Sequence, residues 1–213
     1  MSEGGGLRDV MSGWEPWREE LADLLKRESV RLGSFTLASG RMSHYYVDGR
    51  LATLSARGAV LIGRGMLEAL AEFPQVEAVG GLTMGADPIV GSMLALAGEF
   101  GRPNLIGFLV RKETKGHGTG RRIEGPIRPG LTVAIVDDVA TTGGSSLQAI
   151  EEVERAGCRV AVVLAALDRL EGAAASFAAR QLPFRPLLTI RDLGIEPLPS
   201  SSYQNPLERG YEQ

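Results

Sequence analysis

The sequence predicts an α/β fold in which a parallel sheet is flanked by helices. From residue 76 onward, apolar strands alternate with helical stretches, beginning with "VEAVGG", "ADPIVGSMLALAGEF" and "LIGFLV". These strands are apolar on both faces, as expected for a parallel sheet that is covered on both sides. Of the 213 residues, 44% are hydrophobic and 23% are charged, which is ordinary for a globular protein with one substantial core.

The first part of the chain predicts two helices separated by a strand pair. Residues 1–13 are expected to form a flexible N-terminus. Apolar residues recur at helical spacing in 14–30, "WEPWREELADLLKRESV", and again in 56–73, "ARGAVLIGRGMLEALAEF". Between them, 33–50 reads "GSFTLASGRMSHYYVDGR" and predicts a hairpin or a bent strand pair.

The second part continues the alternation and predicts where a ligand binds. Strands are expected in "LTVAIVDD" (131–138) and "RVAVVLAAL" (159–167), with a helix in "GGSSLQAIEEVERAG" (143–157) between them. A single domain is predicted over 14–195, followed by an irregular tail over 196–213. Ligands of parallel sheets bind beyond the carboxyl ends of the strands. This rule selects four loops, at 80–87, 111–124, 137–145 and 168–172.

Charge and cysteine content exclude several classes of protein. The formal net charge of -3 and the pI near 5.6 argue against a protein that coats nucleic acid or an anionic membrane. The single cysteine, Cys158, excludes an internal disulfide and is expected to be a buried structural thiol. Together with only two histidines, His44 and His117, it leaves no zinc cluster. No apolar run approaches the length of a membrane span, so we expect a cytoplasmic protein.

The stretch "VAIVDDVATTGGSS" (133–146) combines two carboxylates with a glycine-rich turn that opens a helix. Glycines let the backbone approach a ligand, and the hydroxyl and N–H groups suit a phosphate monoester. Asp137 and Asp138 are costly to bury unless a cationic or hydroxyl-rich group lies on them. A ribose 5-phosphate satisfies both halves, since its diol faces the acids and its phosphate faces the turn. A plain strand-to-helix turn with capping hydroxyls is the alternative; a phospho-receiver fits badly, because several strands already precede this one.

A basic segment, "VRKETKGHGTGRRIEG" (110–125), leaves the predicted strand on the same edge of the sheet. In isolation it is typical of a solvated loop. Its position next to a phosphate turn instead favours a cationic lid that closes over a polyanion and excludes water.

Four segments resemble one enzyme family. "VAIVDDVATTGGS" resembles the motif with which type I phosphoribosyltransferases bind phosphoribosyl pyrophosphate (PRPP). "RKETKGHGTG" resembles the flexible catalytic loop of the orotate phosphoribosyltransferases, "FTLASGRMSHYYVD" resembles their N-terminal hood, and "LDRLEGA" matches as well. The resemblance runs from about Leu21 to Leu193. It implies the type I phosphoribosyltransferase fold with a hood at about 14–50.

The resemblance also implies a role for each matching residue. Asp137 and Asp138 would hold the ribose hydroxyls of PRPP, and the turn would cradle its 5-phosphate. Lys112 would reach the neighbouring subunit of a homodimer, while Thr141 and Arg169 would contact orotate, Arg169 by pairing with its carboxylate. The implied PRPP-binding set is Arg111, Lys112, Lys115, His117, Asp137, Asp138, Val139, Ala140, Thr141, Thr142, Gly143, Gly144 and Ser145. The implied catalytic set is Arg111, Lys112, Lys115 and His117.

The implied reaction is Mg²⁺-dependent transfer of ribose 5-phosphate from PRPP to N1 of orotate. It gives orotidine 5-phosphate and pyrophosphate, as a step of UMP biosynthesis. Mg²⁺ would be held mainly through PRPP, without direct protein ligands. His117 is a candidate acid for the departing pyrophosphate, and no protein nucleophile is needed. The expected partners are the small-molecule substrates and a second copy of the chain, with no nucleic acid and no membrane.

The sequence departs from the family pattern at two positions, and two alternative functions are also considered. Some members carry lysines where this chain has Ala38 and Gly85. Pyrophosphate is then expected to rely more on the backbone N–H groups of Thr83 to Ala86 and on the basic loop, with Arg41 as a candidate substitute. One alternative is a phosphoribosyltransferase for a purine, xanthine or uracil. Another is a regulatory protein that senses PRPP or a nucleotide and binds nucleic acid.

Overall fold

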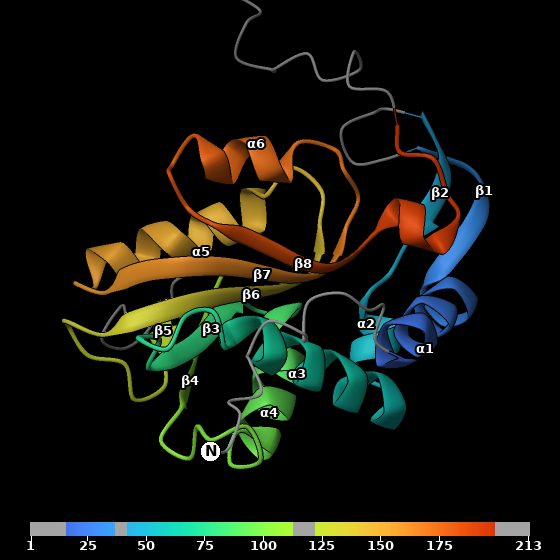
Figure 1. Ribbon diagram of the computed structural model, residues 1–213. Coiled ribbons are helices and arrows are strands. Elements are labelled where there is room, and N and C mark those ends of the chain that lie inside the picture. Colours follow the sequence, from blue (N-terminus) through green and yellow to red (C-terminus); the bar gives the residue numbers. More distant parts are fainter. Residues whose placement is uncertain (1–15, 37–41, 113–121, 199–213) are drawn as a thin grey trace, which may run out of the picture.

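The computed structural model describes residues 16–36, 42–112 and 122–198, which form two sheets (Figure 1). The larger sheet has the strand order β5-β4-β3-β6-β7-β8, and its neighbouring strands are parallel except for β5, which pairs antiparallel with β4. The predicted parallel sheet is therefore confirmed, with the correction that one edge is antiparallel. Its strands are β3 (Ala78–Leu82), β4 (Ile106–Val110), β5 (Ile123–Glu124), β6 (Thr132–Ala140), β7 (Arg159–Asp168) and β8 (Phe184–Thr189).

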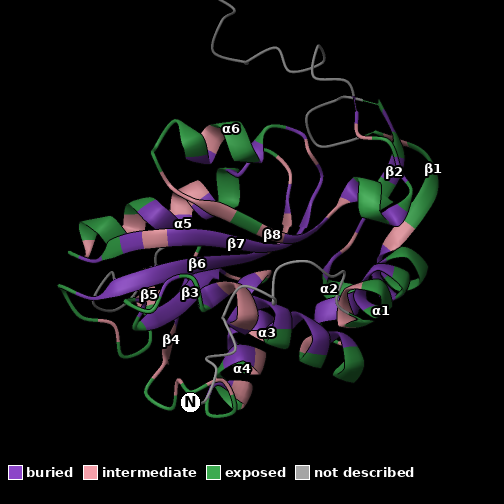
Figure 2. Cartoon of the chain, in the orientation of Figure 1, coloured by how far each residue is buried: buried purple, intermediate pink, exposed green. Residues whose placement is uncertain are grey.

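Helices cover both faces of this sheet (Figure 1). The helices α1 (Pro16–Leu24), α3 (Ala56–Leu70) and α4 (Ala86–Leu96) pack on one face, and α5 (Gly144–Arg155) and α6 (Ala173–Ala178) pack on the other. Successive side chains of β6 point to opposite faces of the sheet, so the strand contributes to a hydrophobic core on each face. Ala134 and Val136 belong to the core on the α3 side, and Val133 and Ile135 belong to the core on the α5 side. Figure 2 shows the central strands buried and the outer faces of the helices exposed.

The smaller sheet is the predicted strand pair. It consists of β1 (Val30–Thr36) and β2 (Met42–Val47), which run antiparallel with an irregular register between Leu32 and Phe35. Along β2, Ser43, Tyr45 and Val47 are buried while the residues between them are exposed, so one face packs on the domain. The predicted helix over 14–30 is shorter than expected, because residues Leu25–Ser29 are π-helical and Val30 already begins β1.

Short connections complete the described chain. The helix α2 (Arg50–Thr53) follows β2, and a 3₁₀ helix (Ile190–Leu193) follows β8. α3 begins after Ser55, whose Oγ accepts a hydrogen bond from the Gly58 N–H group at 3.0 Å. Cys158 is buried, as predicted, and its Sγ–H group donates to the Arg128 carbonyl at 3.3 Å. No helix in the described ranges combines the length and apolarity needed to cross a bilayer.

The strand register brings the predicted ligand loops together. Leu82 at the end of β3 pairs with Val110 at the end of β4, and Gly80 pairs with Ile135 of β6. Ala140 at the end of β6 pairs with Asp168 at the end of β7. The segments that follow these parallel strands therefore leave the same edge of the sheet.

Candidate active site

The acidic pair lies within β6, as the strand predicted over 131–138 implies, so the predicted ligand loop 137–145 starts too early. β6 continues to Ala140, so Asp137 and Asp138 are strand residues near the carboxyl edge. Asp137 is buried, and its Oδ2 accepts a hydrogen bond from Ser146 Oγ at 3.0 Å. The Asp138 N–H group donates to Asp137 Oδ1 at 3.1 Å, while the Asp138 side chain is half-buried. The first acid thus faces α5 and the second lies closer to solvent.

Burial makes Asp137 an unusual carboxyl group. Loss of hydration, followed by repulsion from Asp138, raises the pKa of Asp137 to about 7, although the Ser146 hydrogen bond opposes this shift. At neutral pH the ligand-free site therefore holds a carboxyl group that is poorly compensated by its surroundings. Hydroxyl donors or a cation at this position would compensate the charge.

The turn after β6 forms a small pocket beside the acids. The pocket has a volume of 240 Å³ and is lined by Asp137 and residues 139–145. α5 begins at Gly144, and Gly143 provides no side chain to cap the N–H groups of its first turn. Thr142, Gly144 and Ser145 are exposed, and Thr141 is half-buried. Uncapped N–H groups, hydroxyls and a helix N-terminus make this pocket suited to a phosphate group.

Gly143 is required at its position for two reasons. Its φ is +84°, and a Cβ atom there would lie 2.9 Å from Phe177 Cζ of α6. We expect Gly143→Ala to lower the free energy of unfolding by roughly 1–3 kcal/mol. Gly144→Ala is the matched control, since its Cβ would meet nothing closer than Thr142 Oγ1 at 3.7 Å. Equal urea midpoints for the two variants would contradict this explanation.

Arg169 lies beside the turn and is buried. Its backbone N–H group donates to the Ala140 carbonyl at 2.9 Å, which brings Arg169 next to Thr141. Its Nη2 is 2.7 Å from Glu171 Oε1, and its guanidinium group lies over the ring of Tyr45, 4.8 Å from the centroid. The Tyr45 hydroxyl donates to the same Glu171 oxygen at 2.8 Å. Arg169 is thus fixed by contacts from β2 and from its own loop.

Glu171 and Tyr45 contact Arg169 and were not predicted from the sequence. Tyr45 is fully buried and comes from the small sheet, and its burial raises the pKa of the phenol to about 12. Glu171 is also buried. A glutamate two positions after an arginine was the available signal, but only the fold brings Tyr45 to them.

The ends of the basic segment lie on the adjacent strands. Arg111 follows β4, its N–H group donates to the Arg122 carbonyl at 2.8 Å, and its Nε is 2.9 Å from Glu124 Oε1. Lys112 is exposed. Lys115 and His117 lie outside the described residues, as do Ala38 and Arg41, so their predicted roles stay predictions.

Curated relatives decide the family. No protein-family model matches the chain. An orotate phosphoribosyltransferase of Rhodopirellula baltica is 48% identical over 182 residues, which cover 83% of this chain and 94% of the relative. The enzyme of the same name from Thermosynechococcus vestitus is 49% identical over 177 residues, covering 83% and 92%. The chain belongs to the orotate phosphoribosyltransferase family.

Solved structures agree with this family and with the type I phosphoribosyltransferase fold. The Mycobacterium tuberculosis orotate phosphoribosyltransferase in complex with Fe(III) dicitrate is 44% identical, with a TM-score of 0.75 over 84% of this chain and 100% of that one. The same enzyme in complex with PRPP has a TM-score of 0.71 at 39% identity, with the same coverage. This member of the orotate phosphoribosyltransferase family is thus an enzyme of the pentosyltransferase class.

The structure gives a physical reason for one departure from the family pattern. A Cβ atom at Gly85 would lie 2.6 Å from Asp138 Oδ1, and one at Gly49 would lie 2.7 Å from Asp138 Oδ2. The two glycines come from segments distant in sequence, and both therefore lie against the Asp138 carboxylate. A lysine at position 85 would require this carboxylate to move.

Proposed function

We propose that this phosphoribosyltransferase transfers ribose 5-phosphate from PRPP to N1 of orotate, with release of pyrophosphate, in UMP biosynthesis. One observation carries the proposal: the pocket at an uncapped helix N-terminus is also lined by the buried Asp137, which is followed by the half-buried Asp138. The carboxylates favour hydroxyl donors or cations, whereas the helix N-terminus favours an anion. A ligand with a diol at one end and a phosphate at the other matches both.

PRPP is divided between the two halves of the pocket in this proposal. The ribose hydroxyls donate to Asp137 and Asp138, which stabilises the ionised form of Asp137. The 5-phosphate accepts hydrogen bonds from the turn between Ala140 and Ser145. Binding energy from the phosphate and the ribose holds the anomeric carbon in line for attack by orotate.

In this proposal orotate binds on the side of the turn where Arg169 lies. Arg169 pairs with its carboxylate, and Thr141 contacts the ring. The contacts with Glu171 and Tyr45 fix the guanidinium group before substrate binds, which reduces the entropy lost on binding. Arginine suits this task because its planar donors match a carboxylate.

The site suits a magnesium ion that arrives with PRPP. Its donors are carboxylate oxygens, which Mg²⁺ prefers. Across the described ranges, no three His, Cys, Asp or Glu side chains gather in a metal-binding arrangement. We therefore infer that PRPP supplies most ligands of the ion. When bound, Mg²⁺ stabilises the negative charge that develops on the departing pyrophosphate.

A homodimer in the cytoplasm completes the proposal. Several exposed apolar side chains lie on the small sheet and on the segment that follows it, which favours contact with a second copy of the chain. Lys112, an exposed residue two positions after β4, would reach the partner's site. The exposed apolar residues of these segments are Leu32, Met42, Tyr46, Leu51, Leu54 and Val60.

Lys115 tests the role of the basic segment. In this proposal Lys115 contacts the pyrophosphate, and His117 donates a proton to it. We expect Lys115→Ala to lower turnover at least tenfold, which corresponds to about 1.4 kcal/mol of transition-state stabilisation, with an unchanged thermal midpoint. Wild-type turnover in this variant would remove Lys115 from the mechanism.

A comparison of bases tests the proposed reaction. The purified protein is mixed with PRPP and Mg²⁺, and the loss of orotate absorbance is followed beside parallel reactions with hypoxanthine, xanthine and uracil. We expect transfer to orotate alone, and none without Mg²⁺. Transfer to another base and not to orotate would establish a different substrate. Salt-dependent binding of RNA or DNA at micromolar affinity, without transferase activity, would favour a regulatory protein.

A further inference from the structure

Arg122 joins the two ends of the basic segment to α5. Its Nη2 donates to the Lys112 carbonyl at 2.9 Å, and its Nη1 donates to Glu152 Oε1 of α5 at 2.8 Å. Its own carbonyl accepts the Arg111 N–H group at 2.8 Å. One residue therefore links the start of the segment, the end of the segment and a helix.

We propose that Arg122, held by Glu152, is a positioning residue that fixes the backbone of Lys112 relative to the phosphate-binding end of α5. This inference rests on the proposed function, because it assigns Arg122 a task in that reaction. Arg122 itself contacts neither substrate. It acts through Lys112, whose carbonyl also lies 3.4 Å from Gln148 Nε2 of α5.

The position of α5 gives the link its significance. α5 begins at the turn assigned to the 5-phosphate, and Glu152 lies eight residues after Gly144, or about 12 Å along the helix axis. The same rigid helix thus presents one end to the phosphate of PRPP and contacts the base of the segment assigned to its pyrophosphate. A fixed distance between these two contacts helps to hold PRPP in line for reaction.

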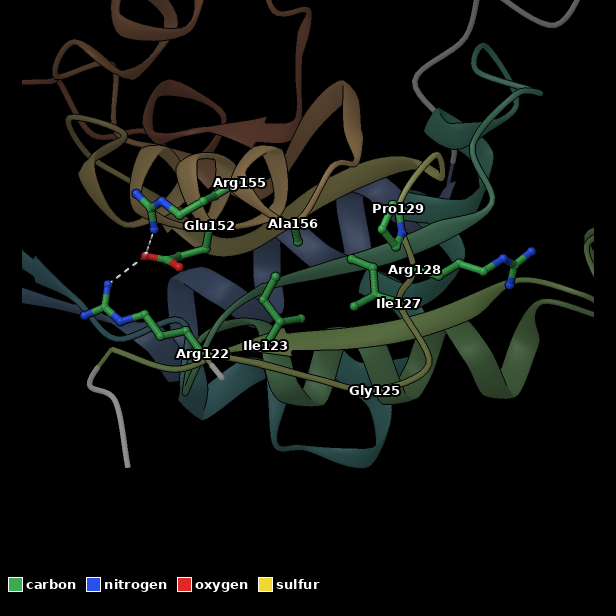
Figure 3. Close-up of a pocket in the computed structure, with 9 residues that line it drawn as sticks. All are labelled: Arg122, Ile123, Gly125, Ile127, Arg128, Pro129, Glu152, Arg155 and Ala156. Carbon is green, nitrogen blue, oxygen red and sulfur yellow. Dashed lines mark hydrogen bonds and ion pairs between the residues drawn. The ribbon is translucent and has the colours of Figure 1, made fainter. Parts of the chain in front are cut away.

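Packing alone does not hold Arg122 in place. The cluster of Arg122, Glu152 and Arg155 borders a pocket of 410 Å³ between α5 and the chain after β5 (Figure 3). The Arg122 side chain is 30% exposed beside this space, and its hydrogen bonds to Glu152 and to the Lys112 carbonyl hold its orientation. Glu152 is suited to the task, because its side chain is only 11% exposed and the Arg122 hydrogen bond holds the pKa of the carboxyl below its usual value.

Arg155 supplies a matched control. Its Nη1 lies 2.6 Å from the same Glu152 oxygen, but it is on α5 and its side chain is 66% exposed. Figure 3 shows both arginines directed to Glu152 from opposite sides. Arg155→Gln therefore removes an ion pair with the same carboxylate and leaves the contact with Lys112 intact.

The first test separates turnover from orotate binding. We expect Arg122→Gln to lower kcat roughly tenfold, the effect of losing one charge-assisted hydrogen bond, while the KM for orotate stays within twofold. Glu152→Gln should act in the same direction, and the double variant should be no slower than Arg122→Gln alone. Arg122→Lys, which keeps the charge, should recover part of the turnover. Arg155→Gln should match the wild type.

The second test needs no activity. The Arg111 amide should exchange its hydrogen faster in Arg122→Gln than in the wild type or in Arg155→Gln, because the base of the segment is loosened. Unchanged kcat and exchange in Arg122→Gln would overturn the proposal, as would equal losses in Arg155→Gln. If the three proteins show this difference in exchange but the wild type transfers nothing to orotate, the proposed function is refuted and the anchoring contact stands.

Discussion

Asp137→Asn is expected to stabilise the ligand-free protein at pH 8 and to lower its transferase activity at least a hundredfold. The folded-state pKa of Asp137 is about 7, against an ordinary value of 3.8. As the pH rises from about 4 to 7, the unfolded chain has lost this proton while the folded protein retains it, so folding becomes less favourable. Asparagine removes this penalty, which we expect to be worth roughly 1–4 kcal/mol above pH 7.

The loss of activity has a separate cause. A neutral amide accepts hydrogen bonds from a ribose diol less strongly than a carboxylate does. We therefore expect PRPP affinity and turnover to fall together.

Unfolding by urea at pH 5 and at pH 8 measures the effect on stability. The gain in Asp137→Asn should be larger at pH 8, because at pH 5 the folded wild-type protein is still largely protonated at this site. Asp138→Asn is the comparison, because it removes only the repulsion from Asp138, which raises the Asp137 pKa less than burial does, so it should stabilise the protein less than Asp137→Asn. If Asp137→Asn is no more stable than the wild type at pH 8, then burial of the ionised Asp137 side chain does not destabilise the folded protein as we infer.

Arg169→Lys is expected to lower kcat/KM for orotate about thirtyfold, equivalent to about 2 kcal/mol, with little change in the KM for PRPP. Lysine retains the charge beside Glu171, but it cannot pair with a carboxylate through two parallel donors or stack on Tyr45 as a planar group. Steady-state kinetics with each substrate varied in turn measure the effect.

The matched control is Arg185→Lys. Arg185 also pairs with a glutamate, with its Nε 3.0 Å from Glu72 Oε2, and lies over an aromatic ring, that of Phe73. It is on β8 and outside the candidate site. If kcat/KM for orotate falls equally in the two variants, a direct role for Arg169 is contradicted.

Much of the main sheet could be predicted because its strands and helices carry strong local patterns. The runs that became β3, β4, β6 and β7 are apolar on both faces, and α3 and α5 keep an apolar stripe at helical spacing. The strands that were missed lack such a pattern. β5 has only two residues, and β8 contains Arg185 and Pro186 within six. Their place in the sheet depends on neighbouring strands.

The candidate site was predictable only where its residues are contiguous in sequence. The acidic pair and the turn follow one another along the chain, so one motif indicated both. The contacts of Arg169 could not be found in this way, because Tyr45 lies in a different sheet and Glu171 is recognisable only once both are buried together. The approach of Gly49 and Gly85 to Asp138 likewise joins segments distant in sequence.

A crystal structure of the protein with PRPP and Mg²⁺ tests most directly whether the acidic pair and the turn form one bipartite site. We expect the 5-phosphate in the turn between Ala140 and Ser145, within hydrogen-bond distance of its N–H groups. We also expect the two ribose hydroxyls on Asp137 and Asp138. A 5-phosphate bound elsewhere on the sheet edge, or ribose hydroxyls directed away from both carboxylates, would contradict it.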